Sequence, residues 1–363
     1  MATLDELRYW CFGGAEPARD GIGLPDEFIF RVMAYRFEPE RHADFRNDYM
    51  HASMKELPLS VESARIAKAF RKANVRFAPI KGADLAESCY PDPAVRIRCD
   101  IDLLVHPDDI DLAVRTAEEE GWHTAHQYRH DSHCPSMYKK KAMLELHFNL
   151  PGFPRESSAE VWDELVSQDG SSEHRLPPEL SLIVAFHHAR HHMWINSGQL
   201  IADYAFLLKT HRDLDWNRAR GYAKRFGVAD PALLCFALPE LFPPEVMPEA
   251  PPPPEKLRLA LREAVLHPVN FQNHQEDAVM NSGDRFGRAW WKARISGFAP
   301  SSVRIRYKLP DSADWRRMTG AYFRMLGDKA KLVWHGMRKK DPEVVRALRR
   351  AETVERGLSE LEK

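Results

Sequence analysis

The feature that most constrains the fold is an acidic pair inside an alternating apolar segment, Arg96-Ile-Arg-Cys-Asp-Ile-Asp-Leu-Leu-Val105. Alternation with a period of two predicts a β-strand. Asp100 and Asp102 then share one face. The apolar side chains share the opposite face and point into a core: Ile97, Cys99, Ile101, Leu103 and Val105. Adjacent carboxylates repel each other, and a divalent cation can neutralise them. The pair therefore indicates a metal site. The alternative is a solvated strand edge, although Asp is depleted in strands.

A strand and a lysine–glycine turn precede this segment. Residues 75–80 predict a short strand, Lys81-Gly82 a turn, and residues 83–89 a helix. Glycine lets a backbone approach a ligand closely, and a helix N-terminus offers free N–H groups to a phosphate. Lys81 adds a positive charge. We therefore predict that Lys81, Gly82 and Ala83 bind phosphate groups. The alternative is an ordinary tight turn.

A second alternating segment follows at residues 142–150. It places Glu145, His147 and Asn149 on one face and apolar side chains on the other. If this strand pairs with the acidic one, Glu145 becomes a third carboxylate facing the same cavity. The alternative is the solvent-facing surface of an antiparallel sheet. By the same parity, Arg96 and Arg98 share the face of the acidic pair. There they bind a triphosphate, or pair with the carboxylates when no metal is present.

These motifs resemble the largely uncharacterised bacterial nucleotidyltransferase family of the DNA polymerase beta-like superfamily. The similar segments are Pro79-Ile-Lys-Gly-Ala-Asp-Leu-Ala86, Tyr90-Pro-Asp-Pro-Ala-Val-Arg96, Arg98-Cys-Asp-Ile-Asp-Leu-Leu-Val105 and Leu144-Glu-Leu-His147. The resemblance continues into Phe186-His-His-Ala-Arg-His-His-Met-Trp194, Asp203 and Asp215-Trp216, and so covers about residues 30–270. It implies an α+β fold, in which a mixed β-sheet core with helices is followed by a helical domain.

The resemblance also implies an enzyme that transfers a nucleoside monophosphate from an NTP such as ATP to an acceptor hydroxyl or phosphate. Asp100, Asp102 and Glu145 would be its catalytic residues and its ligands for Mg²⁺ or Mn²⁺. The usual Gly-Gly or Gly-Ser turn is Gly82-Ala83 here. This departure supports the alternative, a non-catalytic nucleotide-binding or partner-binding module. Retention of all three carboxylates argues against that alternative.

Four histidines form the pattern HHxxHH on a predicted helix: His187, His188, His191 and His192. Pairs at i and i+4 share a face, as in zinc sites, but no HExxH motif is present. We interpret His188 and His192 as structural, with at least one of them hydrogen-bonded to an acid such as Asp203, and expect no tightly held zinc. The alternative is an HD-type metal phosphohydrolase, for which His130-Asp131 supplies the dipeptide.

Composition limits the class of protein. The chain has 363 residues, 44% of them hydrophobic, and a net charge of −1, so no general attraction to nucleic acid or membranes is expected. No apolar run is long enough to span a membrane, and no signal-peptide pattern is present. Five scattered cysteines indicate a reducing compartment. We expect a cytoplasmic protein whose acceptor is a small molecule or a protein, with tRNA as the nucleic-acid exception.

The expected organisation is an N-terminal helical segment, a catalytic core, a helical domain, a proline-rich linker and a C-terminal helical region. Their boundaries are 1–74, 75–155, 156–242, 243–254 and 255–363.

Overall fold

The computed structural model describes residues 2–14, 17, 21–25, 27–124, 135–150, 153–192, 194, 197–268, 318–320, 322 and 342–361. Met1–Pro268 and Thr353–Lys363 form one compact unit, and Val269–Glu352 form a second. The finer division of the first unit at residues 74, 155 and 242 stays a prediction. The dipeptide His130-Asp131 and most of the predicted C-terminal region lie outside the described residues.

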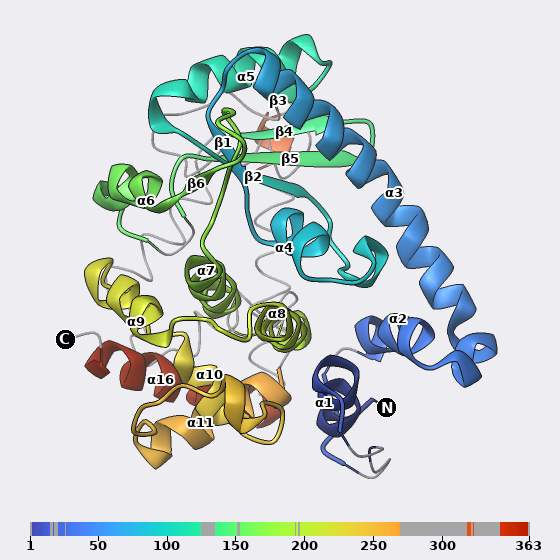
Figure 1. Cartoon of the computed structure of the whole chain (residues 1–363), viewed down its shortest axis with the longest axis vertical. Coiled ribbons are helices and arrows are strands. Elements are labelled where there is room, and N and C mark those ends of the chain that lie inside the picture. Colours follow the sequence, from blue (N-terminus) through green and yellow to red (C-terminus); the bar gives the residue numbers. More distant parts are fainter. Residues whose placement is uncertain are drawn as a thin grey trace. The chain divides into compact units, whose positions relative to one another are not determined.

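A five-stranded mixed sheet forms the core of the first unit and confirms the expected α+β fold (Figure 1). The parallel pair lies inside the sheet, between β2 and β5, and the other neighbours are antiparallel. In spatial order the strands are β1 (Phe77–Pro79), β2 (Ile101–Val105), β5 (Ala142–His147), β4 (Ser136–Lys139) and β3 (His123–Thr124).

Helices cover both faces of this sheet. On one face, α3 (His42–Lys72) and α5 (Ile110–Glu119) pack against the apolar side chains of β2 and β5. On the other face, Ala78 and Leu104 pack against α6 (Ser158–Glu164), α7 (Pro178–His191) and α9 (Trp216–Arg225). All five residues of β2 are buried, as expected for a central strand covered on both sides.

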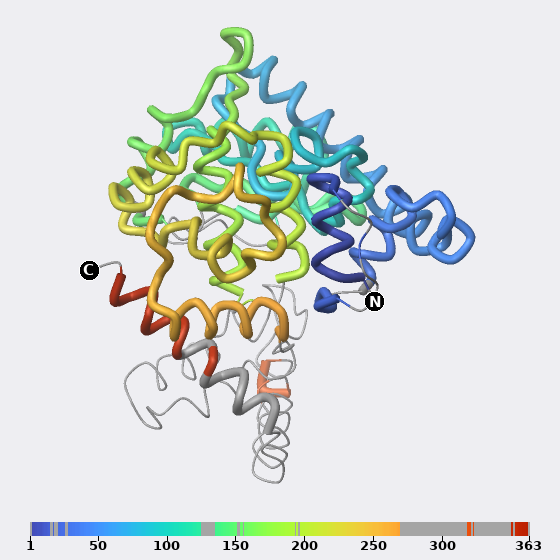
Figure 2. The backbone as a smooth tube through the Cα atoms, turned by 60° about the horizontal axis from the view of Figure 1, so that its bottom comes forward, coloured from blue at the N-terminus to red at the C-terminus, as the bar shows by residue number. Residues whose placement is uncertain are grey.

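The remaining helices form a second core around α8 (Ser197–Thr210). Twelve consecutive residues of α8, from Ser197 to Leu208, are buried, because its side chains are apolar on nearly every side. The N-terminal α1 (Leu4–Phe12) runs beside α8 (Figures 1 and 2). The other helices that contribute to this core are α1 (Leu4–Phe12), α2 (Glu27–Phe37), α10 (Ala232–Ala237), α11 (Glu255–Leu266) and the end of α16 (Pro342–Leu361).

Short elements connect these layers. They are α4 (Gly82–Ser88), β6 (Val166–Ser167), β7 (His174–Arg175) and the 3₁₀ helices Pro39–Arg41, Pro93–Val95, Pro107–Asp109, Arg155–Ser157 and Pro244–Val246. The last of these lies in the proline-rich segment, where Val246 is buried and its carbonyl accepts a hydrogen bond from the Trp216 indole at 3.1 Å. None of the described helices is both long and apolar enough to cross a bilayer.

The strand predicted over residues 96–105 is shorter than expected, because β2 begins at Ile101. Arg96, Arg98 and Asp100 precede the strand, and Cys99 is exposed instead of buried. The physical reason is that both arginine side chains are buried and held by acids on helices, Asp203 on α8 and Glu56 on α3. The chain follows these partners and therefore leaves the sheet before Ile101.

His187, the first histidine of the HHxxHH pattern, is part of the packing between helices. Its Nε2 accepts the backbone N–H of Ala229 at 3.0 Å, and its ring contacts those of Phe153 and Phe186 edge to face. Burial, together with the charge of Arg190, lowers the pKa of His187 to about 4. The imidazole is therefore neutral in the folded protein at neutral pH.

We predict that His187 makes the fold sensitive to acid. Because its pKa is lower in the folded than in the unfolded chain, the unfolded chain binds more protons between the two values, from about 6.5 down to about 4. Stability is therefore lost as the pH falls through this window. Between pH 7 and pH 5, the free energy of unfolding of wild type should fall by about 2 kcal/mol more than that of His187→Gln. Urea unfolding at both pH values measures the difference. The exposed His123→Gln is the matched control and should behave as wild type.

Candidate active site

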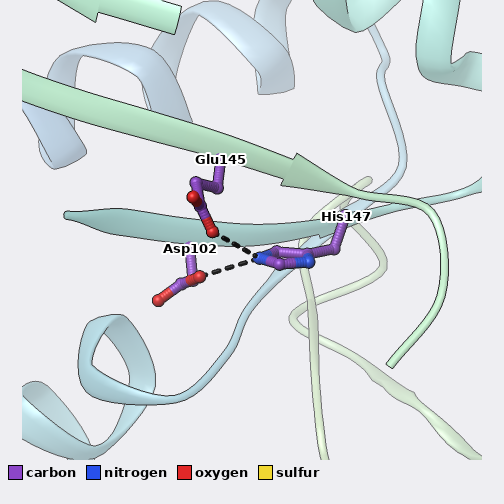
Figure 3. Close-up of side chains that lie close together, drawn as sticks. All are labelled: Asp102, Glu145 and His147. Atoms are coloured by element: carbon purple, nitrogen blue, oxygen red, sulfur yellow. Dashed lines mark hydrogen bonds and ion pairs between the residues drawn. The ribbon is translucent and has the colours of Figure 1, made fainter. Parts of the chain in front are cut away.

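Parallel pairing of β2 and β5 brings Asp102, Glu145 and His147 together (Figure 3). Asp102 lies directly opposite Glu145 in the register, and His147 follows two residues later on the same face. His147 Nε2 lies 2.7 Å from Asp102 Oδ1 and 3.4 Å from Glu145 Oε2. Asp102 and His147 are buried, whereas Glu145 is half-buried. The condition under which the sequence makes Glu145 a neighbour of the acidic strand, the pairing of these two strands, is therefore met.

Lys81 places a positive charge on this cluster. It occupies the turn between β1 and α4, and its Nζ lies 2.6 Å from Asp102 Oδ1 and 3.4 Å from His147 Nε2. Its φ of 52° lies in the left-handed region, which a residue with a side chain occupies only where its surroundings impose it. The turn thus holds the ammonium against the acids at some cost in backbone strain.

The ionisation of Asp102 and His147 follows from these contacts. Burial alone would raise the pKa of Asp102, but the hydrogen bond with His147 and the charge of Lys81 outweigh it and hold the pKa well below its usual range. Burial would lower the pKa of His147, but its hydrogen bonds with Asp102 and Glu145 raise that pKa instead. Asp102 is therefore an anion at neutral pH.

Asp100 lies beside this cluster but outside its tightest part. The ligand atoms of Asp102, Glu145 and His147 all lie within 4.8 Å of one another, and this group does not include Asp100. Burial, then the charges of Asp102 and Glu145, raises the pKa of Asp100 to about 6. The like-charge repulsion expected between Asp100 and Asp102 is therefore present, although Asp100 precedes the strand.

Arg96 and Arg98 do not pair with Asp100 or Asp102. Arg96 forms a buried ion pair with Asp203 at 2.7 Å, and Tyr90 and Gln199 also donate to that carboxylate. Arg98 donates to both carboxylate oxygens of Glu56. The cation that pairs with Asp102 is Lys81 instead. Each arginine thus ties the segment before β2 to a different helix.

Gly82 makes room for one of these arginines. A Cβ at this position would lie 3.3 Å from Arg96 Nη1 and 3.4 Å from Arg98 Cβ. A side chain at this position would make these neighbours shift by a few tenths of an ångström. Ala83, the next residue, is buried in the first turn of α4. The glycine thus allows the close approach of a side chain of this chain.

Asp100 and Asp102 line one wall of a pocket of about 390 Å³, and the histidine helix lines another; Glu145 and His147 are not among its lining residues. Asp100, Asp102 and Lys81 form the side of this pocket next to the sheet. His188 and His192 lie on its wall, with Ala185 and Ala189 of α7, Gln199 and Leu200 of α8, and Phe28 and Ile29 of α2. The pocket therefore joins an acidic, charged side to a largely apolar one.

The histidine prediction needs a correction. His188 and His192 were expected to hydrogen-bond to an acid such as Asp203, but that carboxylate is held by Arg96, Tyr90 and Gln199. The rings of His188 and His192 contact each other, with centroids 4.6 Å apart. Burial and the charge of Lys81 lower the pKa of His188 to about 3, so it is neutral. His188 therefore faces the pocket as an uncharged group.

Two participants in this site, His147 and Glu56, have no role in the sequence-based prediction, and Asp203 is named there with a histidine instead of Arg96 as its partner. His147 was assigned to the right face but given no role, although Glu-x-His on one strand already predicts two adjacent donors. Glu56 and Asp203 carry no local signal, because they lie 42 and 107 residues from their arginine partners.

A family model described as an uncharacterised nucleotidyltransferase matches residues 35–243 of the chain. The matched region holds the whole cluster, both arginines and their acidic partners. No curated protein and no solved structure matches the chain.

We predict that the Arg98–Glu56 pair is a strong stabilising contact. The two side chains are 1% and 7% exposed, so removing one partner leaves a buried, unpaired charge. Glu56→Gln and Arg98→Met should each lower the free energy of unfolding by about 3–5 kcal/mol. The double variant should lower it by clearly less than the sum of the two single effects. Urea unfolding of the four proteins gives the coupling energy. The exposed Glu249→Gln serves as the control, and additive single effects would contradict the prediction.

Proposed function

The chain belongs to the uncharacterised nucleotidyltransferase family, and from this membership we propose that it transfers a nucleoside monophosphate from an NTP to an acceptor hydroxyl or phosphate. The observation that carries the proposal is the β2–β5 register, which sets Asp102 opposite Glu145. Two carboxylates on neighbouring strands, with a lysine from a strand–helix turn beside them, suit phosphoryl chemistry. This arrangement lies entirely within the matched region.

In this proposal Asp100, Asp102 and Glu145 hold a divalent metal ion, Mg²⁺ or Mn²⁺. The donors fit such an ion, because carboxylate oxygens are the ligands that both prefer. When bound, the metal would neutralise charge on the attacking and leaving oxygens of an in-line displacement. Of Asp102 and Glu145, Glu145 is the more exposed. In this proposal it therefore accepts the proton of the acceptor hydroxyl.

The phosphates of the NTP would bind at Lys81, Gly82, Ala83, Arg96 and Arg98. Lys81 supplies a mobile point charge. Arg98 is ion-paired with Glu56. The Nη1 atom of Arg98, however, is buried and has no hydrogen-bond partner among the described residues. An unpaired buried donor costs free energy unless a ligand satisfies it, which supports a role for Arg98 in anion binding.

The acceptor would occupy the apolar side of the pocket. Its lining by Ile29, Ala189 and Leu200 fits a small molecule or a protein side chain better than a charged polymer. ATP is the NTP that we would test first, and tRNA remains a candidate acceptor. The four described cysteines are free, which supports the proposed cytoplasmic location.

A non-catalytic nucleotide-binding or partner-binding module is the second candidate. The observation that favours it is the Lys81 ammonium held on Asp102, together with Gly82 packed against Arg96. In such a module these internal contacts would be permanent. NTP binding without release of pyrophosphate would identify it.

We predict that Asp102→Asn and Glu145→Gln each lower transfer by about 10²-fold or more, because each removes a charge that acts on the reacting groups. The assay incubates the protein with α-phosphate-labelled ATP, a divalent metal and a cell extract, and measures pyrophosphate release and labelled product. Because the acceptor is supplied by the extract, its identity need not be known.

The control for this assay is Asp213→Asn, which changes an exposed acid far along the chain from the cluster. Circular dichroism and thermal melting check that each variant folds. Asp102→Asn removes the buried ion pair with Lys81 and can therefore destabilise the fold. Glu145 is half-buried, so Glu145→Gln is the variant whose effect on transfer is separated from an effect on folding. Unchanged transfer in both variants would refute the catalytic assignment.

A further inference from the structure

We propose that His147 is a direct metal ligand with Asp102 and Glu145, and that this mixed nitrogen–oxygen site prefers divalent first-row transition ions to Mg²⁺. The proposal deepens the proposed function, on which it rests for the presence of a metal at this cluster. It names the composition of the site and the class of ion, and it replaces Asp100 by His147 in the tightest ligand group.

The geometry selects His147. Its Nε2 is the atom that faces both carboxylates, at 2.7 Å from Asp102 Oδ1 and 3.4 Å from Glu145 Oε2. Ligands held about 2.1 Å from an ion at right angles lie about 3 Å apart. The spacing of His147 Nε2 from the two carboxylate oxygens is therefore close to that of a coordination shell, and all three donor atoms lie within 4.8 Å of one another. Asp100 lacks this convergence, because it precedes the strand that fixes the others.

The fold holds these donors in place. Asp102 sits in the central strand β2, which is buried on both faces, and His147 ends the neighbouring β5. Asp102 and His147 are 3% and 6% exposed. A rigid, buried imidazole beside two carboxylates gives the site little freedom to exchange its nitrogen donor for water.

Lys81 is a separate sign that a cation belongs at this position. Its ammonium contacts the Asp102 carboxylate and lies 3.4 Å from His147 Nε2, so it lies against two of the three proposed ligands. An ammonium group cannot share this small space with a metal ion. Lys81 is therefore a stand-in cation, and it must move away when a metal binds.

The imidazole nitrogen among the three proposed ligands determines the preference for transition ions over Mg²⁺. Mg²⁺ binds oxygen ligands almost exclusively and keeps several waters, whereas imidazole nitrogen suits the transition ions. Mn²⁺ is the weakest binder of the first-row series. Comparing Mn²⁺ with Mg²⁺ is therefore the most stringent test of the preference. The other divalent ions of the first-row series should bind more tightly than Mn²⁺.

The experiment titrates metal-free, full-length protein with Mn²⁺, measures free Mn²⁺ by electron paramagnetic resonance, and then displaces bound Mn²⁺ with Mg²⁺. No nucleotide is present. Wild type should bind Mn²⁺ at one site and release it only at a large excess of Mg²⁺. His147→Asp and His147→Asn should each reduce the ratio of Mn²⁺ to Mg²⁺ affinity by about tenfold or more, because an oxygen replaces the nitrogen donor.

Two further variants sharpen this test. Lys81→Met should raise the affinity for both ions roughly tenfold or more, without changing their ratio, because the ammonium no longer competes for Asp102. His123→Asp makes the same chemical change on the exposed edge strand β3 and should leave the ratio unchanged. Should His147→Asp fail to fold with three adjacent acids, His147→Asn still gives the result.

The outcomes separate this inference from the proposed function. A wild-type ratio in both His147 variants, or no Mn²⁺ binding by wild type, overturns the inference. If Mn²⁺ is preferred and no transfer occurs with any metal, the metal site stands and the transferase proposal fails. If transfer occurs and Mg²⁺ binds as well as Mn²⁺, the transferase proposal stands and this inference fails.

Discussion

The site depends on one backbone interaction, the parallel pairing of β2 with β5. Its register sets Asp102 opposite Glu145, and the same register buries Leu103 and Leu146 in the core. A slip of one residue would exchange these two sets of side chains, placing Glu145 in the apolar core and a leucine at the site. The hydrophobic packing of α3 and α5 against this sheet therefore also fixes the positions of the acids. The chemistry of the site is in this sense maintained by the core.

The arginines connect this sheet to the helical part of the chain. Arg98 binds Glu56 on α3, Arg96 binds Asp203 on α8, and all four residues are buried. Burying these charges is costly unless both partners stay in place, so each pair fixes the distance between a helix and the segment before β2. Arg96, Arg98 and Asp203 also line the pocket. The segment from Arg96 to Asp100 is consequently shaped by ion pairs, and β2 by hydrogen bonds of the sheet.

The sequence allowed good predictions where the signal was local or periodic. Alternation predicted β5 and the face shared by Glu145 and His147, and the strand–turn–helix at Lys81-Gly82 was found as expected. Alternation wrongly predicted a strand at Arg96 and Arg98, because a local pattern carries no information on ion-pair partners that lie far along the chain. The pocket wall formed by His188 and His192 was missed for the same reason: helix periodicity gives the face of a residue but not the element it meets.

The charges around the pocket explain why a cation suits it. Arg96 is neutralised by Asp203, Arg98 by Glu56, and Lys81 by Asp102. Asp100 and Glu145 remain as additional acids beside Asp102; burial, and then the charges of Asp102 and Glu145, raises the pKa of Asp100 to about 6. A divalent ion would offset this excess and displace Lys81 from Asp102. The displaced ammonium would then be free to meet an incoming phosphate, so metal and nucleotide would each favour the binding of the other.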